Sequence, residues 1–101
     1  MYVKKYAYQI DLAQLDEFKR IQRRSDEIYK QHVNYTLIVM ENAVHPGRIE
    51  EIQIYLSEES YIEGQQLINK HPEIPLLFQQ FLCVLDPSAH DVKEESYKGM
   101  F

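Results

Sequence analysis

The chain has 101 residues, of which 45% are hydrophobic and 27% are charged, and its formal net charge is −5. This length accommodates one domain with a single core, and the composition is that of a folded globular protein rather than a disordered one. The acidic balance argues against non-specific nucleic-acid binding, which requires a basic surface. No apolar stretch approaches the ~20 residues of a membrane-spanning helix, and the N-terminus lacks a secretory signal, so we expect a cytoplasmic protein.

Residues 2–10 form a tyrosine-rich segment in which two sets of side chains alternate, a pattern typical of a β-strand. One face carries Tyr2, Lys4, Tyr6, Tyr8 and Ile10, and the other carries Val3, Lys5, Ala7 and Gln9. The residues alone leave open which of these faces is inward.

A helix is expected over about residues 12–32, with Asp11 as its N-terminal cap. Apolar side chains recur at helical spacing along it and predict one buried stripe. Its outer face carries four basic residues, namely Lys19, Arg20, Arg23 and Arg24. Acidic residues at i±3 and i±4 favour a solvated face with intrahelical ion pairs, and an anion or partner site is the alternative.

Residues 35–56 predict two strands joined by a tight turn at Pro46-Gly47, where glycine supplies the positive φ that the turn needs. If His45 and Arg48 close this turn, the facing pairs are Leu37–Leu56, Val39–Ile54, Glu41–Ile52, Thr36–Ser57, Ile38–Tyr55 and Met40–Gln53. Side chains alternate between the two faces of a sheet. One face would then be aliphatic and covered by helices, and the other would carry Ile38, Met40, Gln53 and Tyr55.

A second helix is expected after Ser57, a good N-terminal cap, and it must end by His71 because Pro72 disfavours helical geometry in the residue before it. One helical turn within residues 74–80 and a last strand over residues 81–85 are expected to follow, with Cys83 as a buried strand thiol. Residues 1–87 would form the domain. Residues 88–101 would be a C-terminal tail docked on the domain or on a dimer partner, because large apolar residues close it.

The element order βαββαβ predicts an α+β, ferredoxin-like fold with a four-stranded antiparallel sheet and helices on one face. The other face would expose a half-apolar surface, which is an association hazard for a monomer. A homodimer in which two such faces pack into one barrel solves this problem.

The element order, the element lengths and the half-polar open face over residues 1–87 resemble the dimeric α/β-barrel superfamily. This superfamily includes antibiotic-biosynthesis-type and haem-degrading monooxygenases, so the resemblance implies a homodimer and possible monooxygenase-like chemistry. The haem-degrading members use a strand-one asparagine, a tryptophan and a helix-borne histidine. This chain has Gln9 in the nearest strand-one region, no tryptophan, and only His71 in a comparable place. We therefore expect no haem and no other cofactor.

The four histidines are far apart and have no metal-ligand spacing, so no metal site is expected.

Tyrosine combines apolar area with a hydroxyl and suits both interfaces and ligand pockets. The expected function is binding of a small hydrophobic or aromatic ligand in the barrel. The residues expected to line that site are Tyr8, Tyr55, Ile38, Met40 and Gln53. The alternatives are a cofactor-independent monooxygenase-like enzyme, with His71 as the acid–base group, and a protein-interaction module that uses the tail or the basic helix face.

Overall fold

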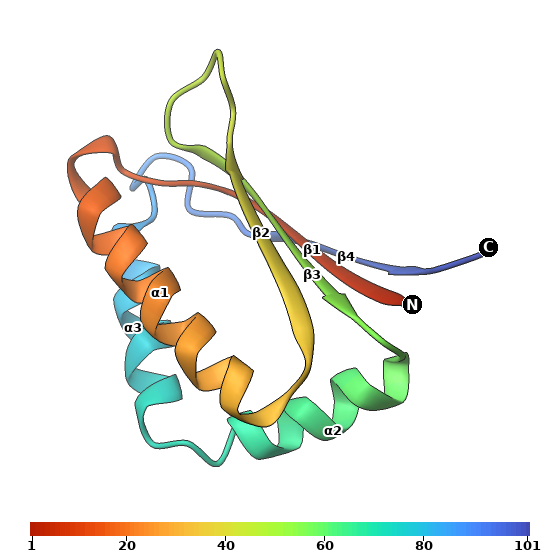
Figure 1. Ribbon diagram of the computed structural model, residues 1–101. Coiled ribbons are helices and arrows are strands. Elements are labelled where there is room, and N and C mark those ends of the chain that lie inside the picture. Colours follow the sequence, from red (N-terminus) through yellow and green to blue (C-terminus); the bar gives the residue numbers. More distant parts are fainter.

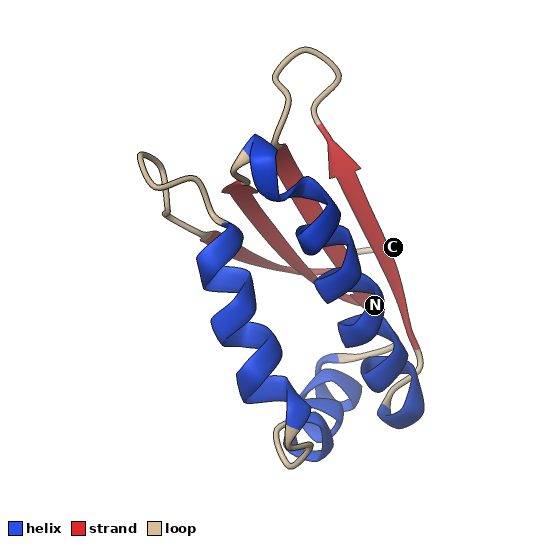
Figure 2. Cartoon of the chain, turned by 90° about the vertical axis from the view of Figure 1, so that its left-hand side faces the viewer, coloured by secondary structure: helices blue, strands red, loops and turns tan.

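A computed structural model covers residues 1–101 and shows one antiparallel sheet with helices on one of its faces (Figures 1 and 2). The elements are β1 (Tyr2–Gln9), the 3-10 helix η1 (Leu12–Gln14), α1 (Leu15–His32), β2 (Tyr35–Glu41), β3 (Arg48–Tyr55), α2 (Glu58–Ile68), α3 (Glu73–Val84) and β4 (Lys93–Lys98). The four strands lie in the order β2-β3-β1-β4. This arrangement confirms the α+β, ferredoxin-like class. None of the helices combines the length and apolarity that crossing a membrane would require.

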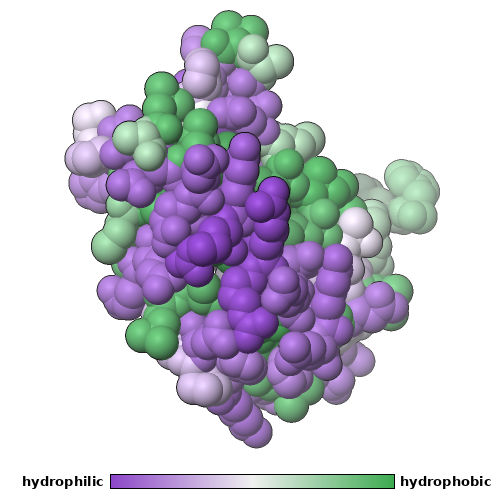
Figure 3. Space-filling model, turned by 60° about the vertical axis from the view of Figure 1, so that its left-hand side comes forward, coloured by the Kyte–Doolittle hydropathy of each residue, from purple (hydrophilic) through white to green (hydrophobic).

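The first helical segment begins and packs as its sequence predicts. The Asp11 carboxylate accepts a hydrogen bond from the Ala13 amide at 3.0 Å, and α1 then buries Phe18, Ile21 and Ile28 against the sheet. On the outer face, Arg20 pairs with Glu17 through an oxygen 2.6 Å away. Figure 3 shows a largely hydrophilic surface on this side of the molecule.

The hairpin has the predicted turn but not the predicted register. Gly47 has a φ of +81°, and the Arg48 amide donates to the His45 carbonyl at 3.3 Å. β3 begins at this turn, but β2 ends at Glu41, because the Asn42 side chain accepts from the amides of Val44 and His45 and makes a longer loop. The facing pairs are therefore Leu37–Gln53, Ile38–Ile52, Val39–Glu51 and Met40–Glu50 instead of the predicted ones.

This shift of three residues reassigns half of the hairpin to the opposite face of the sheet. Leu37 and Val39 share the helix-facing side with Glu51, Gln53 and Tyr55. The helix-free side carries Ile38, Met40, Ile52 and Ile54. The prediction that Gln53 and Tyr55 lie on the open face is wrong, as is the prediction that Ile52 and Ile54 lie under the helices.

The predicted last strand over residues 81–85 is wrong, because this segment continues a helix. Ile74, Leu77, Phe81 and Val84 recur at spacings of three and four, so one face of α3 turns toward the core through all three turns. Only Leu85 keeps a strand-like contact, an isolated bridge to Ile10. Cys83, expected as a buried strand thiol, lies exposed on α3.

The fourth strand comes from the segment that was expected to be a docked tail. Lys93–Lys98 pairs antiparallel with β1, with Ser96 opposite Lys4 and Tyr97 opposite Val3. All six residues are exposed and mostly polar, so this edge strand has no apolar alternation. The backbone ladder places it beside β1 (Figure 1).

The core consists of two clusters. The larger contains Tyr8, Ile10, Phe18, Ile21, Ile28, Ile49, Leu77, Val84 and Leu85, and the smaller contains Tyr2, Val33, Tyr35, Tyr55 and Ile68. The smaller one lies where α2 crosses the end of α1 and the sheet (Figure 1). Gly64 permits this approach, because a Cβ built there would lie 2.9 Å from the Cβ and Cγ2 of Val33.

We expect Gly64→Ala to lower the free energy of unfolding, although alanine favours a helix over glycine by about 1 kcal/mol. The reason is that the new methyl group would overlap Val33, which is itself buried. Denaturant unfolding measures the change, with Gln66→Ala at an exposed position of α2 as the control. A more stable Gly64→Ala protein would contradict the close packing described here.

Candidate functional site

A cavity of about 470 Å³ lies between the helix-facing side of the sheet and the helices α1 and α3. Its walls draw on both core clusters, with Tyr8, Ile21 and Leu77 from the larger one and Tyr35 from the smaller one. Twelve of its eighteen lining residues are hydrophobic. Besides Tyr8, Ile21, Tyr35 and Leu77, the lining residues are Tyr6, Gln22, Ser25, Asp26, Tyr29, Leu37, Glu51, Gln53, Ile74, Phe78, Phe81, Leu82, Val92 and Glu94.

The polar part of this wall is centred on the buried carboxylate of Glu51 from β3. Its Oε1 accepts from the Tyr8 hydroxyl at 2.7 Å and from Gln22 Nε2 at 3.1 Å. Its Oε2 accepts from Gln53 Nε2 at 2.8 Å, and Gln53 Oε1 in turn accepts from the Tyr55 hydroxyl at 2.7 Å. We call these five residues the Glu51 network. Three of them lie on β3, and β1 and α1 each supply one.

The strand alternation explains why this network forms. Glu51, Gln53 and Tyr55 are separated by two residues each, so β3 directs all three to the helix-facing side. Tyr8 on β1 faces the same side of the sheet. It lies opposite Ile49, which precedes Glu51 by two residues on β3. Buried polar groups require hydrogen-bond partners, and each oxygen of the Glu51 carboxylate has at least one.

The tyrosines around the cavity are held in their protonated form. Burial raises the pKa of Tyr8, and the neighbouring Glu51 carboxylate raises it further. Burial likewise raises the pKa of Tyr6, Tyr29 and Tyr35, and Tyr35 also donates to Asp26 at 2.6 Å. These hydroxyls therefore act as neutral hydrogen-bond donors.

Two further carboxylates line the cavity, and each has a cationic partner. Asp26 forms an ion pair with Lys30, with 2.9 Å between Oδ2 and Nζ. Glu94 pairs with the ammonium group of Lys4, which also donates to Ser96 Oγ at 2.8 Å. Burial is the largest single influence on Lys4 and lowers its pKa, but the hydrogen bond to Glu94, the charge of Glu94 and the nearby tyrosines together outweigh burial, so the pKa is raised.

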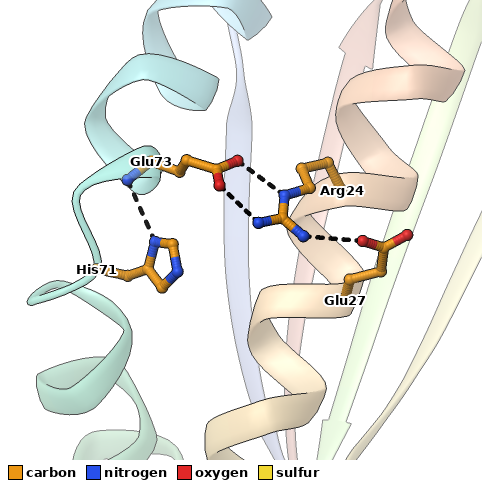
Figure 4. A network of polar contacts seen from close by, with 4 residues as sticks. All are labelled: Arg24, Glu27, His71 and Glu73. Carbon is orange, nitrogen blue, oxygen red and sulfur yellow. Dashed lines mark hydrogen bonds and ion pairs between the residues drawn. The ribbon is translucent and has the colours of Figure 1, made fainter.

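Arg24 on α1 ties the wall that α3 provides to that helix (Figure 4). The Arg24 guanidinium donates to both oxygens of Glu73, at 2.8 and 2.5 Å, and also to Glu27 at 2.9 Å. The hydrogen bonds from Arg24 hold the pKa of Glu73 below its ordinary value. His71 Nδ1 accepts the Glu73 amide at 3.2 Å and so satisfies a backbone donor at the start of α3.

The structure separates the residues that the sequence grouped as one site. Tyr8 and Gln53 line the cavity, and Tyr55 lies directly behind Gln53 as its hydrogen-bond donor. Ile38 and Met40 lie on the opposite face of the sheet. His71 is not among the lining residues and serves as a cap at the start of α3.

Sequence reasoning missed Glu51, Gln22 and the α3 part of the wall. The signal for Glu51 is its position two residues before Gln53 and four before Tyr55, a set that the incorrect register assigned to the open face. No group of three or more His, Cys, Asp or Glu side chains is arranged to hold a metal ion.

No protein-family model and no curated protein sequence matches the chain. Solved structures with the same fold include a candidate antibiotic biosynthesis monooxygenase from Nitrosomonas europaea, which is 13% identical with a TM-score of 0.76 over 99% of this chain and 90% of that one. SnoaB, a cofactor-independent oxygenase from Streptomyces nogalater, is 6% identical, and the match has a TM-score of 0.74 and covers 99% of this chain and 93% of SnoaB. A nipsnap family protein of unknown function from Agrobacterium tumefaciens is 14% identical, and the match has a TM-score of 0.73 and covers 98% of this chain and 87% of that protein's chain. The chain therefore has the fold of antibiotic-biosynthesis-monooxygenase-type proteins, as the resemblance predicted.

We expect Tyr8→Phe to lower the free energy of unfolding by about 1–3 kcal/mol, because it removes a donor from the buried Glu51 carboxylate. Denaturant unfolding checks this value. Tyr2→Phe is the matched control, since Tyr2 lies on the same face of the same strand and its hydroxyl makes no hydrogen bond within the chain. Equal effects of the two substitutions would show that the Tyr8 hydroxyl does not support Glu51.

Proposed function

We propose that the chain binds a small, largely aromatic ligand in the cavity between α1, α3 and the sheet. The observation that carries this proposal is a hollow of about 470 Å³ in which apolar walls surround one buried hydrogen-bonded carboxylate. Ligand sites in proteins are typically concave and mostly apolar, with a few polar groups that orient the bound molecule. The Glu51 network is such a group.

The packing around the cavity supports this proposal. Protein interiors are packed about as densely as organic crystals, and the apolar walls of this open hollow lack dispersion contacts that a ligand can supply. The ring of Tyr8 makes edge contacts with Phe18 and Phe81, with centroids 5.9 and 4.9 Å apart. These rings form a wall against which a flat aromatic molecule packs favourably.

Catalysis of a cofactor-independent oxidation is a second candidate function, and the position of Glu51 favours it. A carboxylate in a cavity with few polar groups can act as a general base toward an acidic proton of a bound molecule. SnoaB, which shares the fold, is a cofactor-independent oxygenase. His71, the group expected from the sequence, lies outside the cavity lining, so Glu51 replaces it as the proposed base.

We also propose that two copies of the chain pair through the sheet face that no helix covers. Ile38 and Met40 expose 39% and 42% of their surface there, and Ile52 and Ile54 lie beside them. A second copy presents an identical apolar face and would remove these side chains from water. In this arrangement each chain keeps its own cavity, because the cavity lies on the other side of the sheet.

For ligand binding, we expect Ser25→Leu to abolish or strongly weaken binding of prodan, an uncharged naphthalene fluorophore. Ser25 lines the cavity from α1, so the larger side chain would occupy the space of the ligand. Fluorescence titration measures the affinity. Gln31→Leu is the control, because it adds the same side chain at an exposed position of α1. Equal binding by both variants would place the fluorophore elsewhere.

For catalysis, we expect the wild-type chain to consume dioxygen with at least one member of a panel of polyphenolic substrates, without added cofactor. The Glu51→Gln variant should lose most of this activity, because an amide cannot accept the proton. An oxygen electrode measures the rate. Activity that survives in Glu51→Gln would remove Glu51 from the role of base, and a panel without any turnover would argue against this second function.

For the association of two copies, we expect the wild-type chain to sediment as a dimer at tens of micromolar. Ile52→Asp should sediment as a monomer, because it places a charge in the middle of the apolar face. Leu76→Asp is the control, since Leu76 is exposed on α3, away from this face. A monomeric wild-type chain in analytical ultracentrifugation would contradict the proposal.

A further inference from the structure

We infer that the ligand of this cavity carries a positively charged amine, which it presents to Glu51. This inference rests on the proposed ligand-binding function and specifies the chemical class of the ligand. It depends on the charges of the side chains around the cavity and on the hydrogen bonds that they already make.

The charged side chains that line the cavity are all acidic, namely Asp26, Glu51 and Glu94. Lys30 neutralises Asp26, and Lys4 neutralises Glu94. Glu51 has no ion-pair partner, and its three donors are a hydroxyl and two amide groups, which are neutral. The cavity therefore contains one buried negative charge that nothing in the chain compensates. A buried charge is costly unless a counter-charge accompanies it.

The hydrogen bonds of Glu51 leave room for one more donor. A carboxylate offers about four acceptor positions. Oε1 already accepts from Tyr8 and Gln22, whereas Oε2 accepts only from Gln53. An ammonium group would supply the missing donor and the missing positive charge together, and charge-assisted hydrogen bonds of this kind are the stronger ones.

The aromatic wall favours the same kind of ligand. Tyr6, Tyr8, Tyr29, Tyr35 and Phe81 surround the cavity, and the faces of aromatic rings attract cations. A carboxylate or phosphate ligand would instead meet Glu51 without a free cation, because no basic side chain lines the cavity. The arrangement thus selects for organic ammonium ions and against organic acids.

The test compares three naphthalenes of nearly equal size whose polar group differs in charge: 2-naphthylmethylamine, 2-naphthylmethanol and 2-naphthoic acid. At pH 7 they are a cation, a neutral alcohol and an anion. We expect the wild-type chain to bind the amine about tenfold or more tightly than the alcohol, and the acid most weakly, as a charge-assisted contact predicts. Isothermal titration calorimetry measures the three affinities.

Two variants assign any preference to Glu51. Glu51→Gln should bind the amine and the alcohol about equally. Glu50→Gln removes the same charge from the residue just before Glu51 on β3, and the side chain of Glu50 points to the other face of the sheet. This variant should retain the wild-type preference for the amine. Thermal unfolding confirms that each variant is folded.

Each result has a distinct meaning. Equal affinity of wild type for amine and alcohol, or a preference for the acid, overturns the inference and leaves the proposed ligand site standing. A preference for the amine that survives in Glu51→Gln also overturns it. No binding of any of the three naphthalenes overturns the proposed function and, with it, the inference. If Glu51→Gln fails to fold, the order of the three affinities on the wild-type chain still decides whether the cavity selects an organic ammonium ion.

Discussion

The burial of one carboxylate in the middle of the sheet is the constraint on which the rest of this structure depends. Glu51 is 9% exposed and lies on the helix-facing side of β3, where a simple two-layer fold would place an aliphatic side chain. A buried acceptor that lacks donors is destabilising, so the fold surrounds this one with Tyr8, Gln22 and Gln53. These partners come from β1, α1 and β3, so the network links two neighbouring strands of the sheet to the helix above them.

The cavity follows from this constraint. Because polar side chains occupy the centre of the sheet, the apolar residues gather into two clusters on either side of it. The wall supplied by α3 packs mainly on α1, to which Arg24 ties it through Glu73 (Figure 4). Neither helix fills the space above the Glu51 network. The hollow is therefore built into the arrangement of polar and apolar residues on β3, β1 and α1.

The sequence predicted the elements whose signals are local. Asp11 and Ser57 begin helical segments as caps, and Gly47 adopts the positive φ that its turn requires. The hairpin register could not be predicted, because it depends on a side-chain cap by Asn42 that lengthens the loop. Because of this shift in register, the sequence did not predict that Glu51, Gln53 and Tyr55 face the helices. The fourth strand was also not predicted, because an exposed, polar edge strand is defined by its backbone pairing with β1 and not by any apolar alternation.

The central claim is that the helix-facing cavity, and not the open face of the sheet, is where a ligand binds. Methyl NMR with 2-naphthylmethylamine tests it directly, because both places contain isoleucine methyl groups. We expect the signals of Ile21, Ile74 and Leu77, which line the cavity, to shift on titration, while those of Ile38, Ile52 and Ile54 stay in place. Shifts confined to the open-face isoleucines would contradict the account.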